Sequence, residues 1–165
     1  MTIDVQPINA THVENFRACV DAIARERKFL AQVEAVGLEQ MRRFVADNIG
    51  QDIAQFVALD RDRVVGWCDI VPGWAYAFHH CGTLGIGVLA QYRGQGIGKR
   101  LMTAAIAKAR QNGITRIELQ TRIDNLGAIG LYESMGFVRE GRKRRAMRID
   151  GAYFDMIELA RVFDD

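Results

Sequence analysis

The sequence predicts a single α/β domain, residues 1–165, with a mixed, mostly antiparallel sheet of about seven strands flanked by helices. Three observations predict this class. Short runs of alternating apolar and polar residues follow one another across tight turns in the first half of the chain. Helical periodicity starts abruptly after a glycine-rich segment, and the chain closes with two extended runs across a two-residue turn. The predicted element order is βααβββαβαββ, and no repeat or linker divides it.

The N-terminal third is expected to supply one strand and two helices. The alternating run from Ile3 to Pro7 is typical of a short strand that ends at a proline. Thr11 is expected to cap the next helix, with Glu14 completing a capping box three residues later. A second helix is expected from Leu38 to Val45, and the connection from Arg25 to Gly37 is expected to be partly helical.

The middle of the chain is expected to form three strands with short connections. Gln55 to Leu59 and Arg63 to Val71 are extended runs on either side of the turn Asp60–Asp62. After Pro72-Gly73, a third extended run reaches Thr83 to Val88. The short connections predict antiparallel pairing.

The second half alternates helix and strand. After Gly94 the apolar residues recur at helical spacing, and Gly113 is placed to end that helix. One helical crossover should bring two strands together in parallel. The elements that follow are a strand, a helix and a hairpin turning at Asp150-Gly151: Ile114 to Thr121, Asn125 to Met135, Val138 to Ile149 and Tyr153 to Val162.

Composition and charge narrow the function classes. The formal net charge of +2 is too small for a general nucleic-acid binder. The three cysteines lack metal-ligand spacing, so free thiols and no metal are expected. The N-terminus is unlike a secretory signal, and no apolar stretch approaches the roughly 20 residues that a membrane helix needs. These features predict a cytoplasmic protein without membrane contact.

The segment between the extended run Thr83 to Val88 and the following helix has the features of an anion-binding site. Glycines without Cβ atoms let backbone N–H groups converge on a small oxyanion, and the helix N-terminus adds a favourable field. Two basic side chains add full charges. The residues concerned are Arg93, Gly94, Gly96, Gly98 and Lys99.

Two better-known glycine loops do not fit this segment. The dinucleotide-binding fingerprint requires glycine at the position of Lys99. The P-loop requires a glycine and a hydroxyl at the positions of Arg93 and Arg100. The remaining pattern, Arg-x-x-Gly-x-Gly, consists of Arg93, Gly96 and Gly98. It resembles the coenzyme A pyrophosphate loop of the GNAT family of N-acetyltransferases.

The resemblance extends to the strand before the loop, because Leu84 to Val88 is similar to the fourth strand of that family. It implies that the backbone around Ile86 and Val88 pairs with the pantetheine arm of acetyl-CoA and offers an N–H near the thioester carbonyl. It also implies pyrophosphate contacts along the whole loop: Arg93, Gly94, Gln95, Gly96, Ile97, Gly98 and Lys99.

A second signature lies in the segment Asn125 to Phe137, which reads Asn-x-x-Ala-x-x-Leu-Tyr-x-x-x-Gly-Phe. Asn125 is a good helix N-cap and Gly136 a good helix end. The segment resembles the second signature of the GNAT family, so the resemblance covers the chain from about Val57 onward. It implies that Tyr132 is the general acid beside the cofactor sulfur and that Asn125 contacts the pantetheine arm. A tyrosine titrates near ~10 and a cysteine-like thiol near ~8.5, so a hydrogen bond to the departing sulfur can suffice without complete proton transfer.

The base that deprotonates the attacking amine is left open by the sequence. Many GNAT relatives carry a glutamate where this chain has Thr83, so that assignment fails. The alternatives are His80, which titrates near the required pH, and Asp69 on the neighbouring strand, acting directly or through water. His79 is expected to point to the opposite face of the strand.

The acceptor pocket in this family is formed by the first two helices and the loop between them. Here that loop offers Glu26 to hold a cationic amine and Phe29 as a wall. Trp74 and Tyr76 are further pocket candidates.

The two signatures together predict an enzyme that transfers acetyl from acetyl-CoA to a primary amine of a small molecule, protein or peptide. The alternative is a non-catalytic module that senses acyl-CoA. A role at RNA or the ribosome would use the basic run Arg142 to Arg145, but strand alternation favours a solvated edge for these residues. An apolar sheet face would support a homodimer, although no residue pattern specifies one.

Overall fold

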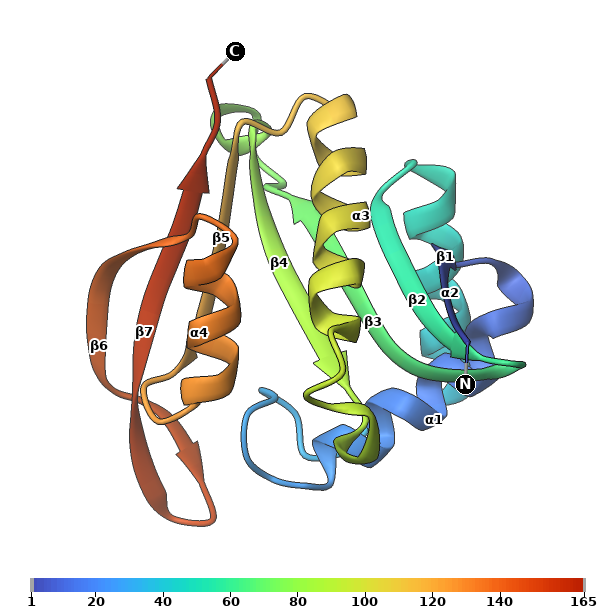
Figure 1. The fold of residues 1–165 in the computed structure, drawn as a ribbon, viewed down its shortest axis with the longest axis horizontal. Coiled ribbons are helices and arrows are strands. Elements are labelled where there is room, and N and C mark those ends of the chain that lie inside the picture. Colours follow the sequence, from blue (N-terminus) through green and yellow to red (C-terminus); the bar gives the residue numbers. More distant parts are fainter. Residues whose placement is uncertain (1, 165) are drawn as a thin grey trace.

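A computed structural model describes residues 2–164, which fold around a seven-stranded sheet in the order β1-β2-β3-β4-β5-β7-β6 (Figure 1). The predicted fold class and the order βααβββαβαββ are confirmed. The strands are β1 (Ile3–Pro7), β2 (Ala54–Asp60), β3 (Arg63–Pro72), β4 (Cys81–Val88), β5 (Arg116–Arg122), β6 (Val138–Ile149) and β7 (Ala152–Val162). The helices are α1 (Val13–Ala24), α2 (Leu38–Gly50), α3 (Ile97–Gln111) and α4 (Leu126–Ser134).

Helices cover both faces of the sheet, with α3 and α4 on the near face in Figure 1. The buried side of α3 repeats at helical spacing, and this helix packs on β2, β3 and β4. On the other face α1 packs against β3, where the rings of Phe16 and Trp67 meet edge to face with centroids 5.8 Å apart. None of the helices within residues 2–164 has both the length and the apolar character needed to cross a membrane.

One seam in the sheet positions the functional site. The strands β4 and β5 pair in parallel, as the crossover predicted, but only over Cys81–Thr83 and Arg116–Glu118. Beyond these three residue pairs β5 pairs with β7 alone, while β4 continues along β3 as far as Val88. The two strands therefore diverge, as Figure 1 shows. Side chains of both strands, among them Ile86 of β4 and Gln120 of β5, line a cavity at the opening between them.

Three local expectations for the first half of the chain are wrong. Asn9 caps a 3-10 turn, Ala10–His12, that precedes α1. Its side chain accepts from the Thr11 N–H and its backbone N–H donates to His12 Nδ1, so Thr11 and Glu14 do not form the predicted box. The connection from Arg25 to Gly37 contains no helix. His79 and His80 lie in the turn before β4 and not on the strand, so strand alternation does not apply to them.

The β6–β7 hairpin turns where predicted, with Asp150 and Gly151 at φ of 50° and 82°. These angles suit a two-residue turn of mirror-image type. The register shifts between Lys143 and Met147, and Arg145 takes a left-handed φ of 51°. Arg142 to Arg145 are all exposed. The bulge interrupts the regular strand register only after Lys143.

Candidate functional site

Two cavities meet at the opening between β4 and β5. One, of about 420 Å³, extends along β4 to the glycine-rich segment and is called the loop cavity. The other, of about 450 Å³, extends over β5, β6 and β7 and is called the acidic cavity. Five residues line both: Phe29, Leu30, Ile86, Asn125 and Tyr132. A ligand entering along the loop cavity and a ligand entering along the acidic cavity would therefore meet at these side chains.

The loop cavity ends at the N-terminus of α3. Gly94 and Gly96 have φ of 74° and 78°, the left-handed region that favours glycine, and the space where their Cβ atoms would lie is open. The helix α3 that starts here has no side-chain N-cap hydrogen bond and no acidic residue in its first turn. Its first N–H groups are therefore available to an anion, with the helix dipole adding to the attraction.

Arg93 is fixed at the edge of this cavity by a double hydrogen bond to Glu26. Arg93 Nη1 lies 3.0 Å from Glu26 Oε2 and Nη2 lies 2.7 Å from Oε1, while Nε donates to the Val88 carbonyl at 2.8 Å. Glu26, which the sequence placed at the acceptor, lines neither cavity. Its carboxylate instead ties the segment after α1 to the segment before α3.

Tyr132 lies at the junction of the two cavities and is 6% exposed. Burial, with a smaller contribution from a charge on Cys68, raises the pKa of Tyr132 well above its ordinary value. The phenol is therefore protonated at neutral pH and can donate a hydrogen bond.

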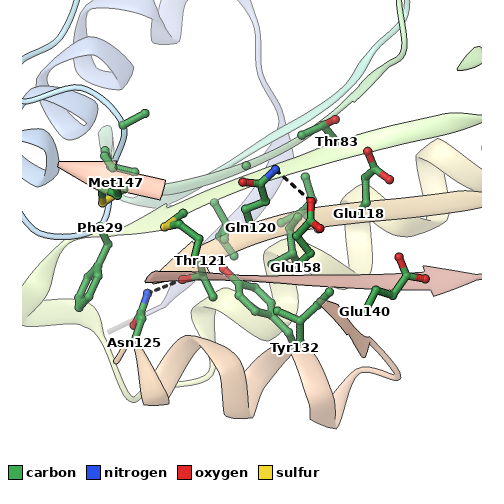
Figure 2. Close-up of a pocket in the computed structure, with 18 of the residues that line it drawn as sticks. Phe29, Thr83, Glu118, Gln120, Thr121, Asn125, Tyr132, Glu140, Met147 and Glu158 are labelled. Carbon is green, nitrogen blue, oxygen red and sulfur yellow. Dashed lines mark hydrogen bonds between the residues drawn. The ribbon is translucent and has the colours of Figure 1, made fainter. Parts of the chain in front are cut away.

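Asn125 precedes α4 but does not cap it with its side chain. Its Nδ2 donates to Thr121 Oγ1 at 3.1 Å, as the dashed line in Figure 2 shows. This hydrogen bond orients the amide at the junction and leaves Oδ1 for another donor.

The acidic cavity takes its character from three glutamates on three strands: Glu118 on β5, Glu140 on β6 and Glu158 on β7 (Figure 2). Arg116 lies between two of them, with Nε 3.0 Å from Glu118 Oε2 and Nη1 3.0 Å from Glu140 Oε1. Lys143 Nζ lies 2.9 Å from Glu158 Oε1. Three carboxylates against these two cations leave the cavity negative, which favours a cationic ligand.

Most of the residues predicted to bind the cofactor line the loop cavity. They are Ile86, Val88, Arg93, Gly94, Gly96, Gly98, Lys99 and Asn125. Gln95 does not, because its side chain donates to the Gln91 carbonyl at 3.1 Å. Ile97 is 2% exposed and packs in the core, so only its backbone faces the segment. Phe29 and Tyr132 line both cavities.

The side chains of the turn before β4 do not line the site. His80 lines neither cavity, is exposed, and lies 3.3 Å from Cys81 Sγ through Nε2. It precedes Ile86 by six residues, which is about 20 Å along an extended strand. Trp74 and Tyr76 are 95% and 91% exposed and also line neither cavity.

The sequence interpretation missed the three glutamates and Arg122. A signal for part of them was present, since Arg116, Glu118, Gln120 and Arg122 alternate along β5 and mark one polar face. Arg122 stacks over the Phe154 ring at 3.5 Å and lies 5.2 Å from the Phe29 ring, and its Nη1 donates to the Lys28 carbonyl at 2.9 Å. Arg122 therefore holds Phe29 against the end of β5.

Within residues 2–164, no three His, Cys, Asp or Glu side chains are grouped to hold a metal ion. Residues 20–137 match the model of the acetyltransferase (GNAT) family. The chain belongs to the GNAT family. The matched range runs from within α1 to the residue before β6, so it contains the glycine-rich segment, both signatures and Tyr132.

Curated relatives resemble a little under half of this GNAT chain. It is 45% identical over 81 residues to N-alpha-acetyltransferase RimI of Mycobacterium tuberculosis, which is 49% of this chain and 46% of the relative. It is 41% identical over 75 residues to N-alpha-acetyltransferase 30 of Saccharomyces cerevisiae, 44% of this chain and 43% of the relative. The chain thus spans about half the length of the curated relatives that it matches.

Solved structures share the fold over nearly the whole chain. A GNAT acetyltransferase of Streptococcus pneumoniae superposes with a TM-score of 0.92 at 22% identity, covering 98% of this chain and all (100%) of that one. The structure of yncA from Salmonella typhimurium with its cofactor acetyl-CoA has a TM-score of 0.93 at 14% identity, covering 100% and 96%. At these identities the likeness concerns the GNAT fold.

Proposed function

We propose that this GNAT protein transfers the acetyl group of acetyl-CoA to a primary amine of a small molecule, protein or peptide. The observation that carries the proposal is the junction at Tyr132, where a cavity with an anion-binding helix terminus meets a cavity lined by carboxylates. The names of the curated relatives, N-alpha-acetyltransferases, support the reaction class.

The loop cavity suits acetyl-CoA at both ends. Its open helix terminus, with Lys99 and Arg93 beside it, fits a pyrophosphate. Beyond Thr83, the backbone of β4 pairs only with β3, so its groups facing the opening are available to the amides of a pantetheine arm. Bound there, acetyl-CoA would supply the acetyl thioester near Tyr132.

Tyr132 then stabilises the charge that develops on the sulfur as the carbon–sulfur bond breaks. Because its pKa is raised, the phenol keeps its proton and donates a hydrogen bond at the position of the leaving sulfur. The same raised pKa makes complete proton transfer to sulfur less favourable, so the hydrogen bond carries most of the effect.

The acidic cavity supports an acceptor that arrives as a cation. An amine is mostly protonated near neutral pH, and the glutamates lower the free energy of that ion at the mouth of the site. A peptide N-terminus, as the relatives' names indicate, and a small polyamine both fit this description.

We expect Glu118→Gln to raise the KM for a cationic acceptor about 3- to 10-fold and to leave kcat nearly unchanged, because one attractive charge is lost from the cavity. The change should shrink at high salt as the field is screened. Glu133→Gln is the matched control, since Glu133 pairs with Arg139 on the α4 surface outside both cavities. Steady-state kinetics at two salt concentrations make the test, and an unchanged KM in Glu118→Gln would remove the electrostatic argument.

One assay tests the function as a whole. Purified protein, acetyl-CoA and a panel of amines (a short peptide, a diamine and a free amino acid) are monitored for release of free thiol, with acetyl-CoA affinity measured by calorimetry. Turnover with any amine of the panel supports the proposed acetyltransferase activity. Binding without turnover across the panel would favour the acyl-CoA sensor, and absence of binding would exclude both.

A further inference from the structure

Asp69 on β3 lines neither cavity itself, but its carboxylate lies directly behind a glycine that lines the acidic cavity. In the register of β3 and β4, Asp69 lies directly opposite Gly85, and directly opposed side chains share one face of a sheet. Gly85 lines the acidic cavity next to Ile86. A Cβ atom at Gly85 would lie 3.0 Å from Asp69 Oδ1, so the missing side chain is what leaves the carboxylate uncovered on that side.

The surroundings of Asp69 provide no charge to balance it. Across β2 its directly opposed neighbour is Gln55, which is neutral and whose Nε2 is buried without a partner. The helix α1 that packs on this face buries Phe16, Cys19, Val20 and Ile23. The thiol of Cys19 is neutral, because burial raises its pKa to about 12. The adjacent titratable group is Cys68, on the opposite face of β3, whose pKa is itself raised, mainly by burial and also by the charge of Asp69.

Burial alone raises the pKa of Asp69 to about 7. A carboxylate with that pKa is partly ionised at neutral pH and is a far stronger base than an ordinary aspartate. This is the range in which a general base is most effective near neutral pH.

We propose that Asp69 is the general base of the reaction and takes the acceptor's proton through a water lying over Gly85. The inference rests on the proposed acetyl transfer. The ammonium of the acceptor gives one proton through the water to Asp69, which passes it to solvent. The amine nitrogen bonds to the acetyl carbon as the carbon–sulfur bond breaks, and the second nitrogen proton ends on the departing sulfur.

The arrangement also explains how this chain dispenses with the glutamate that many relatives carry at the position of Thr83. Thr83 and Gly85 lie two residues apart on the same face of β4, and both line the acidic cavity. A base on β3 opposite Gly85 lies on that same face of the sheet.

Four variants separate the candidates. Asp69→Asn removes the base while keeping the shape, and Gly85→Ala keeps Asp69 but covers it. His80→Ala removes the imidazole that the sequence offers as the alternative base. Asp62→Asn makes the same chemical change as Asp69→Asn in the exposed turn between β2 and β3 and serves as the control.

The measurement is kcat/KM against pH under single-turnover conditions, with two acceptors of different pKa. A peptide α-amine titrates near ~8 and an alkylamine near ~10.4. A limb of the pH–rate profile that shifts when the acceptor is changed therefore reports the titration of the acceptor amine. A limb near pH 7 that stays in place belongs to the protein. We expect Asp69→Asn to abolish that limb and to lower the rate about 100- to 10,000-fold. We expect Gly85→Ala to lower the rate as well, and His80→Ala and Asp62→Asn to keep both limb and rate.

The melting temperature of Asp69→Asn separates a general base from a structural residue, because the two roles predict changes of opposite sign. A carboxylate whose folded-state pKa is raised destabilises the fold as pH rises from its unfolded pKa through its folded pKa. Asp69→Asn should therefore melt several degrees above the parent at pH 8, with the gain shrinking as pH falls below 7 and lost near pH 4.

The outcomes are distinct. An Asp69→Asn protein that is inactive but more stable than the parent at pH 8 supports Asp69 as the general base. An Asp69→Asn protein that keeps rate and limb excludes Asp69 and leaves the acetyl transfer intact, and loss of the limb in His80→Ala would assign the base to the histidine instead. Loss of both activity and stability at pH 8 in Asp69→Asn would make the residue structural. A parent protein that turns over no amine refutes the transfer reaction and the base with it.

Discussion

Replacing Tyr132 by phenylalanine should slow acetyl transfer by about 100- to 10,000-fold in a single turnover, the range of general acid catalysis. The ring is buried at the cavity junction and packs against Phe137 with centroids 6.2 Å apart, and phenylalanine keeps that packing. Only the hydroxyl is lost, and it matters most when charge develops on the sulfur. The affinity for acetyl-CoA should therefore change little while the rate of the chemical step falls.

Rapid-quench measurement with enzyme in excess isolates that step, since slow product release would hide the effect in steady-state kcat. Because the pKa of Tyr132 is raised, the loss should be uniform between about pH 6 and 9 and should not produce a new limb. Tyr153→Phe, on the exposed part of β7, is the control for removing a phenol hydroxyl. A Tyr132→Phe protein as fast as the parent would reduce Tyr132 to a packing residue.

Gly98→Asp should weaken acetyl-CoA binding by at least about 100-fold, which corresponds to roughly 3 kcal/mol. The residue is in the first turn of α3, where a carboxylate interacts favourably with the helix dipole, so the fold should persist. The same carboxylate would occupy the place of the pyrophosphate and repel it. Its Cβ would also lie 3.0 Å from Leu131 Cδ2 and narrow the loop cavity between α3 and α4.

Gly37→Asp provides a matched control, because it places the same side chain at the N-terminus of α2, in open space and outside both cavities. Calorimetry of the two variants with acetyl-CoA, accompanied by circular dichroism, makes the comparison. Equal affinity in Gly98→Asp and the parent would exclude the start of α3 as the pyrophosphate site.

Elements governed by local rules could be predicted from the sequence. The hairpin at Asp150-Gly151, the periodicity of α3 and the glycines of the loop each depend on residues close together in the chain. The connection from Arg25 to Gly37 could not, because its conformation depends on distant partners. Within it, Arg27 takes a left-handed φ of 53° and hydrogen-bonds to Asp150 across 123 residues.

The candidate site divides in the same way. The glycines and Tyr132 lie in contiguous signatures, whereas the acidic cavity assembles Glu118, Glu140 and Glu158 through the strand order β5-β7-β6. Glu26 had the chemistry of an amine ligand, but its partner Arg93 is 67 residues away in the chain and close in space. The placement of Asp69 against Gly85 required the register of β3 on β4.

The short parallel seam between β4 and β5 makes this domain mechanically two half-sheets, β1–β4 and β5-β7-β6. Backbone hydrogen bonds cross the seam over three residue pairs, and farther along the two halves are held by side chains such as Arg122 on the Lys28 carbonyl. Fluctuations that widen the opening should therefore cost less free energy than global unfolding. A ligand filling the opening touches both halves, so its binding free energy is added to the cohesion of the whole sheet. Ligand binding at this seam should therefore also stabilise the contact between the two half-sheets.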